Sequence, residues 1–208
     1  MTESTNTESS TIRLDFGCGK SKIVEQGKSW LGIDSRSFPG VDLVLDLTDK
    51  ESSTQHADYS VTHVYKQYPW ETESVSEIHT SHFVEHLEPK ERIHFINECW
   101  RILKVGGQVR IIVPHWCSER ALGDLSHSAH TVSEMWFYYL DANWRSFNAP
   151  HNDFYTCHFN FTCGYSMRND LLVRNQEYQN FALQNFKGAA QDLICTLTKA
   201  PMPEIKSA

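Results

Sequence analysis

The feature that most constrains this chain is a short apolar run, Ile12 to Phe16, that ends directly in Gly17-Cys18-Gly19. The glycines allow a sharp turn and a close approach of the backbone to a ligand. The pattern predicts a buried strand that leads into a tight turn. Similar short apolar segments follow at residues 30–33, 41–45, 76–80 and 108–113. Together they predict a mostly parallel sheet that is covered on both faces.

The clearest predicted helix lies between the fourth and fifth of these strands. Its apolar positions recur at spacings of three, four and three residues and form one stripe: Ile93, Ile96, Trp100 and Leu103. Pro89 suits the first turn of this helix. Alternating strands and helices predict an α/β layered fold with right-handed crossovers. Leu193 to Leu197 is expected to join the sheet as an antiparallel C-terminal strand.

The domain organisation follows from length and composition. With 208 residues, 40% of them hydrophobic, the chain is predicted to form a single domain over residues 11–208. The polar residues 1–10 predict a disordered tail. Residues 115–175 are dense in aromatic and histidine side chains and are predicted to form a lid insertion over the C-terminal edge of the sheet.

Charge and cysteine content limit the partners. The 26 acidic residues outnumber the 19 basic ones, and the net charge of -7 argues against nucleic-acid binding. The sequence shows neither a signal peptide nor an apolar run long enough to cross a membrane. Its six cysteines are scattered without a CxxC pair, which predicts reduced thiols. These features together predict a cytoplasmic protein that is not attached to a membrane.

Three predicted strand ends carry residues suited to a nucleotide-like ligand. In a doubly wound sheet the ligand lies beyond the C-terminal strand ends. Gly17 and Gly19 follow the first strand, Asp34 the second, and Asp46 the third. Asp34 has the spacing of a ribose-binding carboxylate, and Asp46 could accept a hydrogen bond from an adenine amino group. The alternative is that these residues only form turns and helix caps.

The ordered segments LDFGCGKSK, WLGIDSR, VLDLTD, SVSEIHTSHFVEHL and INECWRILKVGGQVRIIVP resemble the motif set of class I S-adenosylmethionine-dependent methyltransferases. The similarity covers roughly residues 11–115 and is closest to small members with an EHL motif after the fourth strand. It implies a Rossmann-like methyltransferase that uses S-adenosylmethionine. It also implies a set of cofactor-binding residues: Asp15, Gly17, Cys18, Gly19, Asp34, Ser35, Asp46, Leu47, Ser81 and His82. The third glycine of the first motif and the usual proline at Val105 are absent.

A methyl acceptor that must lose a proton would benefit from a base with a pKa near neutrality, which histidine supplies. The candidate catalytic residues are His115, at the end of the fifth strand, and Asp124 with His127. The segment Gly123 to His127 resembles an Asp-Pro-Thr-His-like loop that covers the cofactor pocket in some relatives. The alternative for each histidine is a structural role in a polar lid. His86, at a helix start, is predicted to be structural.

Metal binding is not predicted. The residues His127, His130, Cys157, His158 and Cys163 include zinc-ligand types, but their spacings match no standard site.

The predicted reaction is methyl transfer from S-adenosylmethionine to an oxygen or nitrogen atom of a small-molecule or sugar-type acceptor. Enzymes that methylate DNA amino groups resemble one another in a [DNS]PP[YF] motif, where this chain has His79-Thr80-Ser81-His82-Phe83. The Pro-Cys nucleophile of cytosine-C5 enzymes is also absent. Two alternatives stay open: a non-catalytic module that binds the cofactor, and a methyltransferase that acts on protein or nucleic acid.

Overall fold

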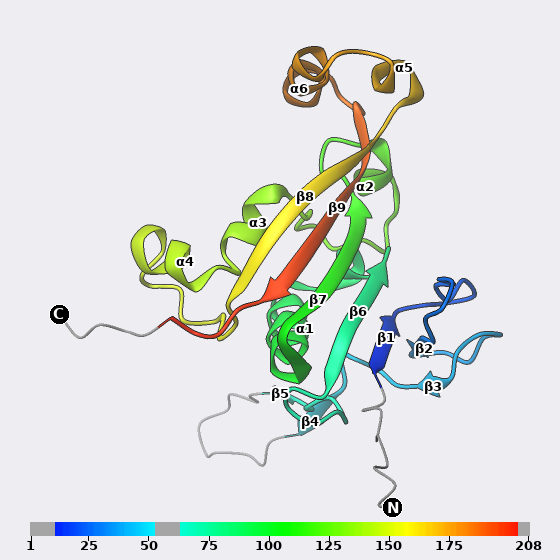
Figure 1. Cartoon of the computed structure of the whole chain (residues 1–208), viewed down its shortest axis with the longest axis vertical. Coiled ribbons are helices and arrows are strands. Elements are labelled where there is room, and N and C mark those ends of the chain that lie inside the picture. Colours follow the sequence, from blue (N-terminus) through cyan, green and yellow to red (C-terminus); the bar gives the residue numbers. More distant parts are fainter. Residues whose placement is uncertain (1–10, 53–62, 204–208) are drawn as a thin grey trace, which may run out of the picture.

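The computed structural model describes residues 11–52 and 63–203. They form a seven-stranded sheet in the order β3-β2-β1-β6-β7-β9-β8 (Figure 1). Its strands are β1 (Ile12–Phe16), β2 (Leu31–Asp34), β3 (Leu43–Val44), β6 (Val75–Ser81), β7 (Leu103–Pro114), β8 (Phe159–Met167) and β9 (Ala190–Lys199). The strands β3, β2, β1, β6 and β7 are parallel to one another, whereas β9 is antiparallel to both β7 and β8. The predicted mostly parallel sheet with an antiparallel C-terminal strand is confirmed.

Some strands differ from the prediction. The third strand was expected over residues 41–45, but β3 has two residues. A separate two-stranded sheet of β4 (Lys50–Ser52) and β5 (His63–Tyr65) was not predicted. Nor was β8, which lies within the range assigned to a lid. The predicted tail, residues 1–10, lies outside the described residues.

The predicted helix is α1, which runs from Pro89 to Ile102. It begins with a capping box, in which the side chains of Glu88 and Glu91 each accept a hydrogen bond from the other residue's backbone N–H. Phe95 and Ile96 are buried on the face turned toward the sheet, and Phe95 makes an edge contact with Phe16 of β1. The buried face of α1 therefore packs against β1, although it includes Phe95, which the predicted stripe did not contain.

Only one face of the sheet has a continuous apolar layer. Strand register aligns one buried apolar row: Leu14, Ile78, Val109 and Leu197. The adjacent row is polar: Asp15, His79, Arg110 and Thr196. The prediction of a sheet covered on both faces is therefore wrong. The chain makes tight turns rather than helices after β1 and β2, and Arg110 on the polar face is exposed.

The predicted lid region divides into parts with different roles. It contains a short helix α2 (Glu119–Gly123), then α3 (Glu134–Tyr138) and α4 (Ala142–Asn148), before β8 begins. Phe137 and Leu140 are fully buried in the main core, and the ring of Phe137 contacts Phe161 of β8. These aromatic side chains belong to the core because α3 packs against the sheet.

The β8–β9 hairpin carries its own connection, α5 (Asn169–Leu172) and α6 (Gln176–Asn185), which extends beyond the end of the sheet (Figure 1). Within the hairpin, Cys163 and Cys195 face each other in register and form a disulfide. The prediction of reduced thiols is therefore wrong for this pair. The cause is strand pairing, which brings together two cysteines separated by 32 residues in the sequence.

The helices of the described residues are all too short or too polar to cross a bilayer.

Candidate functional site

The candidate site is a cavity of about 560 Å³ beyond the C-terminal ends of β1, β2 and β6. One wall comes from the first three predicted strand ends: Gly17, Gly19, Asp34, Ser35, Asp46 and Leu47. A second part of the lining comes from the end of β6, the following 3₁₀ helix η1 (Val84–His86) and a loop after α2: His82, Phe83, His86 and Ser126. We call these the carboxylate wall and the histidine wall. Six of the ten predicted cofactor-binding residues lie on the first and one, His82, on the second.

The glycine loop has a geometry that requires glycine. Gly17 and Gly19 have φ angles of +66° and +52°. A Cβ atom on Gly17 would lie 2.6 Å from the ring of Phe83. The backbone N–H groups of Gly17 and Cys18 both donate to the carbonyl of Ile33, at 2.9 and 3.1 Å, which ties the loop to β2. The loop thus presents bare backbone to the cavity.

Asp34 is held by the backbone around it. Its Oδ2 accepts a hydrogen bond from Gly19 N at 3.0 Å, and its Oδ1 accepts one from Arg36 N at 3.0 Å. Each carboxylate oxygen can accept a further bond, so this carboxylate fits the two hydroxyls of a ribose. Asp46 on β3's continuation is held similarly, because its Oδ1 accepts from Thr48 N and Oγ1 at 2.8 and 2.7 Å. The carboxylate wall therefore fits a nucleoside-type cofactor.

Three predicted cofactor residues, Asp15, Cys18 and Ser81, are not among the residues that line this cavity. Asp15 is buried behind the glycine loop, where its Oδ2 accepts from Ile23 N at 2.7 Å and its Oδ1 contacts His79 Nδ1 at 2.8 Å. Cys18 is also buried, and burial raises the pKa of its thiol to about 11. The structure gives Asp15 and Cys18 positions that support the loop from behind.

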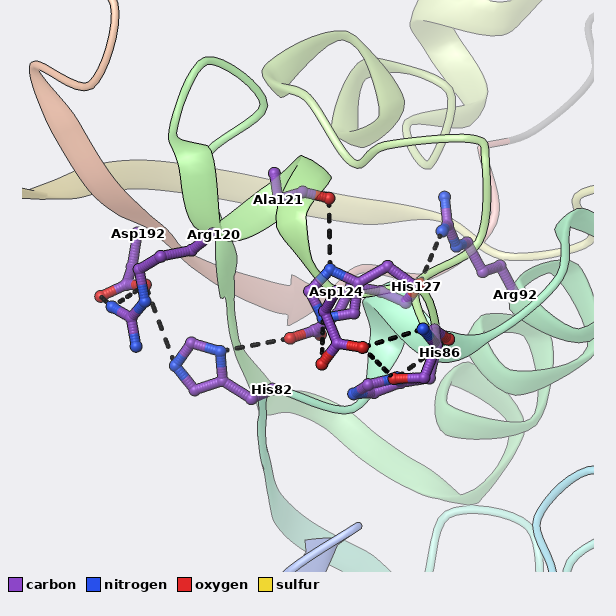
Figure 2. Close-up of polar contacts among 10 residues, drawn as sticks. His82, His86, Arg92, Arg120, Ala121, Asp124, His127 and Asp192 are labelled. Carbon is purple, nitrogen blue, oxygen red and sulfur yellow. Dashed lines mark hydrogen bonds and ion pairs between the residues drawn. The ribbon is translucent and has the colours of Figure 1, made fainter.

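His82 begins the histidine wall in an unusual backbone conformation. Its φ angle is +53°, which non-glycine residues adopt rarely. Its Nδ1 lies 3.2 Å from Glu85 Oε1, and its Nε2 lies 3.8 Å from Asp192 Oδ1 (Figure 2). The hydrogen bond to Glu85 raises the pKa of His82 above its ordinary value. Asp192 also pairs with Arg120 at 3.1 Å, so α2 and β9 both reach this wall.

The predicted pair Asp124 and His127 lies next to His86 (Figure 2), but neither residue lines the cavity itself. Asp124 Oδ1 accepts from Ser126 N and Oγ at 2.8 and 2.7 Å, which shapes the loop as an Asx-type turn. The rings of His86 and His127 lie 4.8 Å apart at an interplanar angle of 74°. His86, predicted to be structural, lines the cavity. Its contact with Ser126 spans 40 residues of sequence, so no local pattern indicated it.

His115, the other predicted catalytic residue, is not brought to this cavity. It is buried, and it lines a second cavity of about 480 Å³ together with Trp116, Glu134 and Tyr165. Its Nε2 lies 3.0 Å from Glu134 Oε1, and its Nδ1 lies 2.9 Å from Cys117 Sγ. The hydrogen bond from His115 lowers the pKa of Glu134 to about 2. The three predicted catalytic residues therefore occupy two separate places.

Comparisons with known proteins agree with this fold. The model of a methyltransferase domain family matches residues 14–111. No curated protein sequence matches significantly. Among solved structures, an S-adenosylmethionine-dependent methyltransferase from Archaeoglobus fulgidus is 17% identical with a TM-score of 0.56, over 92% of this chain and 87% of that one.

Two further solved structures have a TM-score of 0.51. Geranyl diphosphate C-methyltransferase from Streptomyces coelicolor A3(2) is 13% identical, over 92% of this chain and 74% of that one. The 1,6-didemethyltoxoflavin-N1-methyltransferase from Burkholderia thailandensis is 12% identical, over 91% and 71%. These two differ in the atom that they methylate, so the likeness identifies a fold and not an acceptor. Residues 14–111 therefore match a methyltransferase domain family, and the chain has the fold of the class I S-adenosylmethionine-dependent methyltransferases.

Proposed function

We propose that the protein transfers the methyl group of S-adenosylmethionine to an oxygen or nitrogen atom of a small-molecule or sugar-type acceptor. One observation carries this proposal: a single cavity has the cofactor-type residues on one wall and the polar side chains His82, His86 and Ser126 on the other. Its volume of about 560 Å³ lies within the range of small-molecule sites, roughly 300–1,000 Å³.

The two walls suit the two halves of the reaction. Bound S-adenosylmethionine supplies an electrophilic methyl group, which an acceptor lone pair displaces in line. The carboxylate wall holds the nucleoside part through Asp34 and the glycine loop. The histidine wall then faces the acceptor with ring nitrogens and a hydroxyl, groups that hydrogen-bond to a hydroxyl or an amine.

Charge around the cavity supports a small acceptor over a nucleic acid. Three carboxylates line it, those of Asp34, Asp46 and Glu91, against the one guanidinium of Arg36. A polyanionic backbone gains affinity by pairing its phosphates with lysine and arginine. This cavity has more acidic than basic side chains, so it does not favour a chain of phosphates.

The first test is calorimetric titration with S-adenosylmethionine. Asp34→Ala removes both acceptor oxygens for the ribose and should weaken binding by roughly 2–4 kcal/mol, or about thirtyfold or more. Asp49→Asn is the matched control, because Asp49 pairs with Lys66 and does not line the cavity. Equal affinities for the wild type and Asp34→Ala would contradict the assignment of the carboxylate wall.

The second test measures turnover. The wild type is incubated with S-adenosylmethionine and a panel of small hydroxyl and amine compounds, and release of S-adenosylhomocysteine is followed by chromatography. We expect release that depends on at least one acceptor. Tight cofactor binding with no turnover on any acceptor would favour the non-catalytic module instead.

A further inference from the structure

Three side chains of the histidine wall form a cluster with the chemistry of a metal site. A carboxylate oxygen of Glu85 and one ring nitrogen each of His86 and His127 lie within 4.8 Å of one another. We infer that this cluster binds a late first-row divalent metal ion such as Zn²⁺. His86 also lines the cavity that the proposed methyl transfer uses.

Glu85 provides an independent reason to expect a cation. Its side chain belongs to a residue that is only 5% exposed, and its Oε1 already contacts His82. Its Oε2 is buried and has no hydrogen-bond partner among the described residues. An unpartnered buried carboxylate oxygen is costly, and native structures rarely keep one without an ion or water. The buried guanidinium of Arg92 does not meet this need, because it donates to the backbone carbonyls of Val84 and Glu85.

The hydrogen bonds of both histidines prepare one ring nitrogen for a metal. Nδ1 of His127 lies 3.2 Å from the carbonyl of Ala121, and Nδ1 of His86 lies 3.2 Å from the carbonyl of Ser126. A carbonyl oxygen only accepts, so each Nδ1 that faces one carries the hydrogen and leaves the lone pair on Nε2. The hydroxyl oxygen of Ser126 also lies 3.2 Å from Nδ1 of His86, and it can accept the same hydrogen. Metal-binding histidines are oriented in this way by carbonyl or carboxylate partners.

The donor set selects the class of metal. Two imidazoles with one carboxylate are the ligands of many catalytic zinc sites, which keep a further position open. Imidazole favours Zn²⁺ and its neighbours over Mg²⁺, which prefers oxygen ligands only. Asp124 adds a carboxylate at the edge of the cluster, with Oδ2 at 3.8 Å from His127 Nε2.

The place of the cluster suggests its use. Because His86 and Ser126 line the same cavity as Asp34, the open position of the metal would face the acceptor. There the ion would hold an acceptor oxygen next to the methyl donor and orient it for attack. This use rests on the proposed methyl transfer, whereas metal binding by the cluster does not.

The test begins with protein stripped by a chelator. Zn²⁺ is titrated by calorimetry, and Co²⁺ is titrated with its visible absorption as a report on nitrogen and oxygen ligands. We expect one ion per chain. His127→Gln and His86→Gln should each weaken binding by at least about tenfold to hundredfold. Even mutation of a residue that only hydrogen-bonds to a metal ligand has an effect of that size. Glu85→Gln should do the same if the variant folds.

His130→Gln is the matched control, because His130 is exposed in the same loop and lies outside the cluster. Binding that His130→Gln weakens as much as His127→Gln, or a wild type that binds no ion, would overturn the inference. His86 is exposed, so its variant tests the site without disturbing the core. Titration of metal-free protein with S-adenosylmethionine separates the two proposals. Cofactor binding without any metal site would remove only this inference, and a metal site without cofactor binding would remove only the methyl transfer.

Discussion

The two halves of the chain build their parts of the site in different ways. In residues 12–114 the carboxylate wall is held locally, since Asp34 accepts hydrogen bonds from Gly19 and Arg36. In residues 115–199 the side chain that lines the cavity, Ser126, contacts His86, which lies 40 positions earlier in the sequence. The comparison shows that strand-end motifs place the carboxylate wall directly, whereas the histidine wall also depends on how the second half packs.

The largest expected effect tests whether the second half is core rather than lid. Phe137→Ala removes a fully buried ring that contacts Trp136 and Phe161. It should lower the free energy of unfolding by about 3–5 kcal/mol, measured by urea denaturation. Phe147→Ala is the control, because Phe147 is 86% exposed. If Phe137→Ala were as mild as Phe147→Ala, α3 would be a detachable lid after all.

The next effect tests how closely the glycine loop is built. Gly17→Ala places a Cβ atom 2.6 Å from the Phe83 ring and forces a side chain onto a φ of +66°. The combined strain should destabilise the protein by about 2–4 kcal/mol and weaken cofactor binding. Gly27→Ala has a similar φ of +77° but meets nothing within 4 Å. Thermal unfolding of both variants separates backbone strain from the contact; equal losses would show that Phe83 moves aside freely.

A smaller effect is the pH dependence of stability that Glu134, in the second half of the chain, contributes. The hydrogen bond from His115, supported by Tyr165, holds the pKa of Glu134 at about 2, below its ordinary value of 4.5, although partial burial acts in the opposite direction. Because the pKa of Glu134 is lower in the folded state, its ionised carboxylate stabilises the folded protein above about pH 4.5. This contribution is lost as the pH falls from 4.5 to about 2.

Glu134 is 31% exposed, so solvent screening reduces the contribution to about 1–2 kcal/mol. Urea denaturation of the wild type and Glu134→Gln at pH 6 and pH 3 measures it. We expect the two proteins to differ more at pH 6. A difference that does not change with pH would show that the His115 contact is not formed in solution.

The smallest effect tests the contact between the halves. Asn97 of α1 donates to the carbonyl of Phe154 at 2.9 Å and accepts from Thr156 N at 3.0 Å. Asn97→Ala should cost about 1 kcal/mol in unfolding free energy. Asn185→Ala removes an amide that donates within α6, to Phe181, and should cost less. The reverse order would mean that this bridge contributes little to holding the halves together.

Much of the fold could be predicted because its signals are local. The short apolar segments predicted the strands β1, β2, β6, β7 and β9, and the apolar spacing predicted the helix α1. The strand β8 also carried a signal: Phe159, Phe161, Cys163 and Tyr165 alternate with polar or small residues. That alternation was hidden within a segment defined by its aromatic and histidine content. Composition over sixty residues was therefore a poorer guide than spacing over nine.

The candidate site was predicted unevenly for the same reason. Gly17, Gly19, Asp34 and Asp46 line the cavity because a strand end fixes each of them. His115 also follows a strand end, but β7 is long and carries it to a different cavity. Glu85 and His86 gave no metal signal because their partner His127 lies about forty residues later. Only the packing of the loop after α2 against η1 brings these groups together.

The sheet order also has a consequence for synthesis of the chain. Because β9 lies between β7 and β8, β7 emerges from the ribosome long before its antiparallel partner exists. Until residue 199 is made, the nascent protein exposes an apolar strand edge that includes Val109 and Ile111. Such an edge is a template for pairing with other chains. The hazard of aggregation through this edge is thus greatest during translation. It ends when β9 is inserted between β7 and β8.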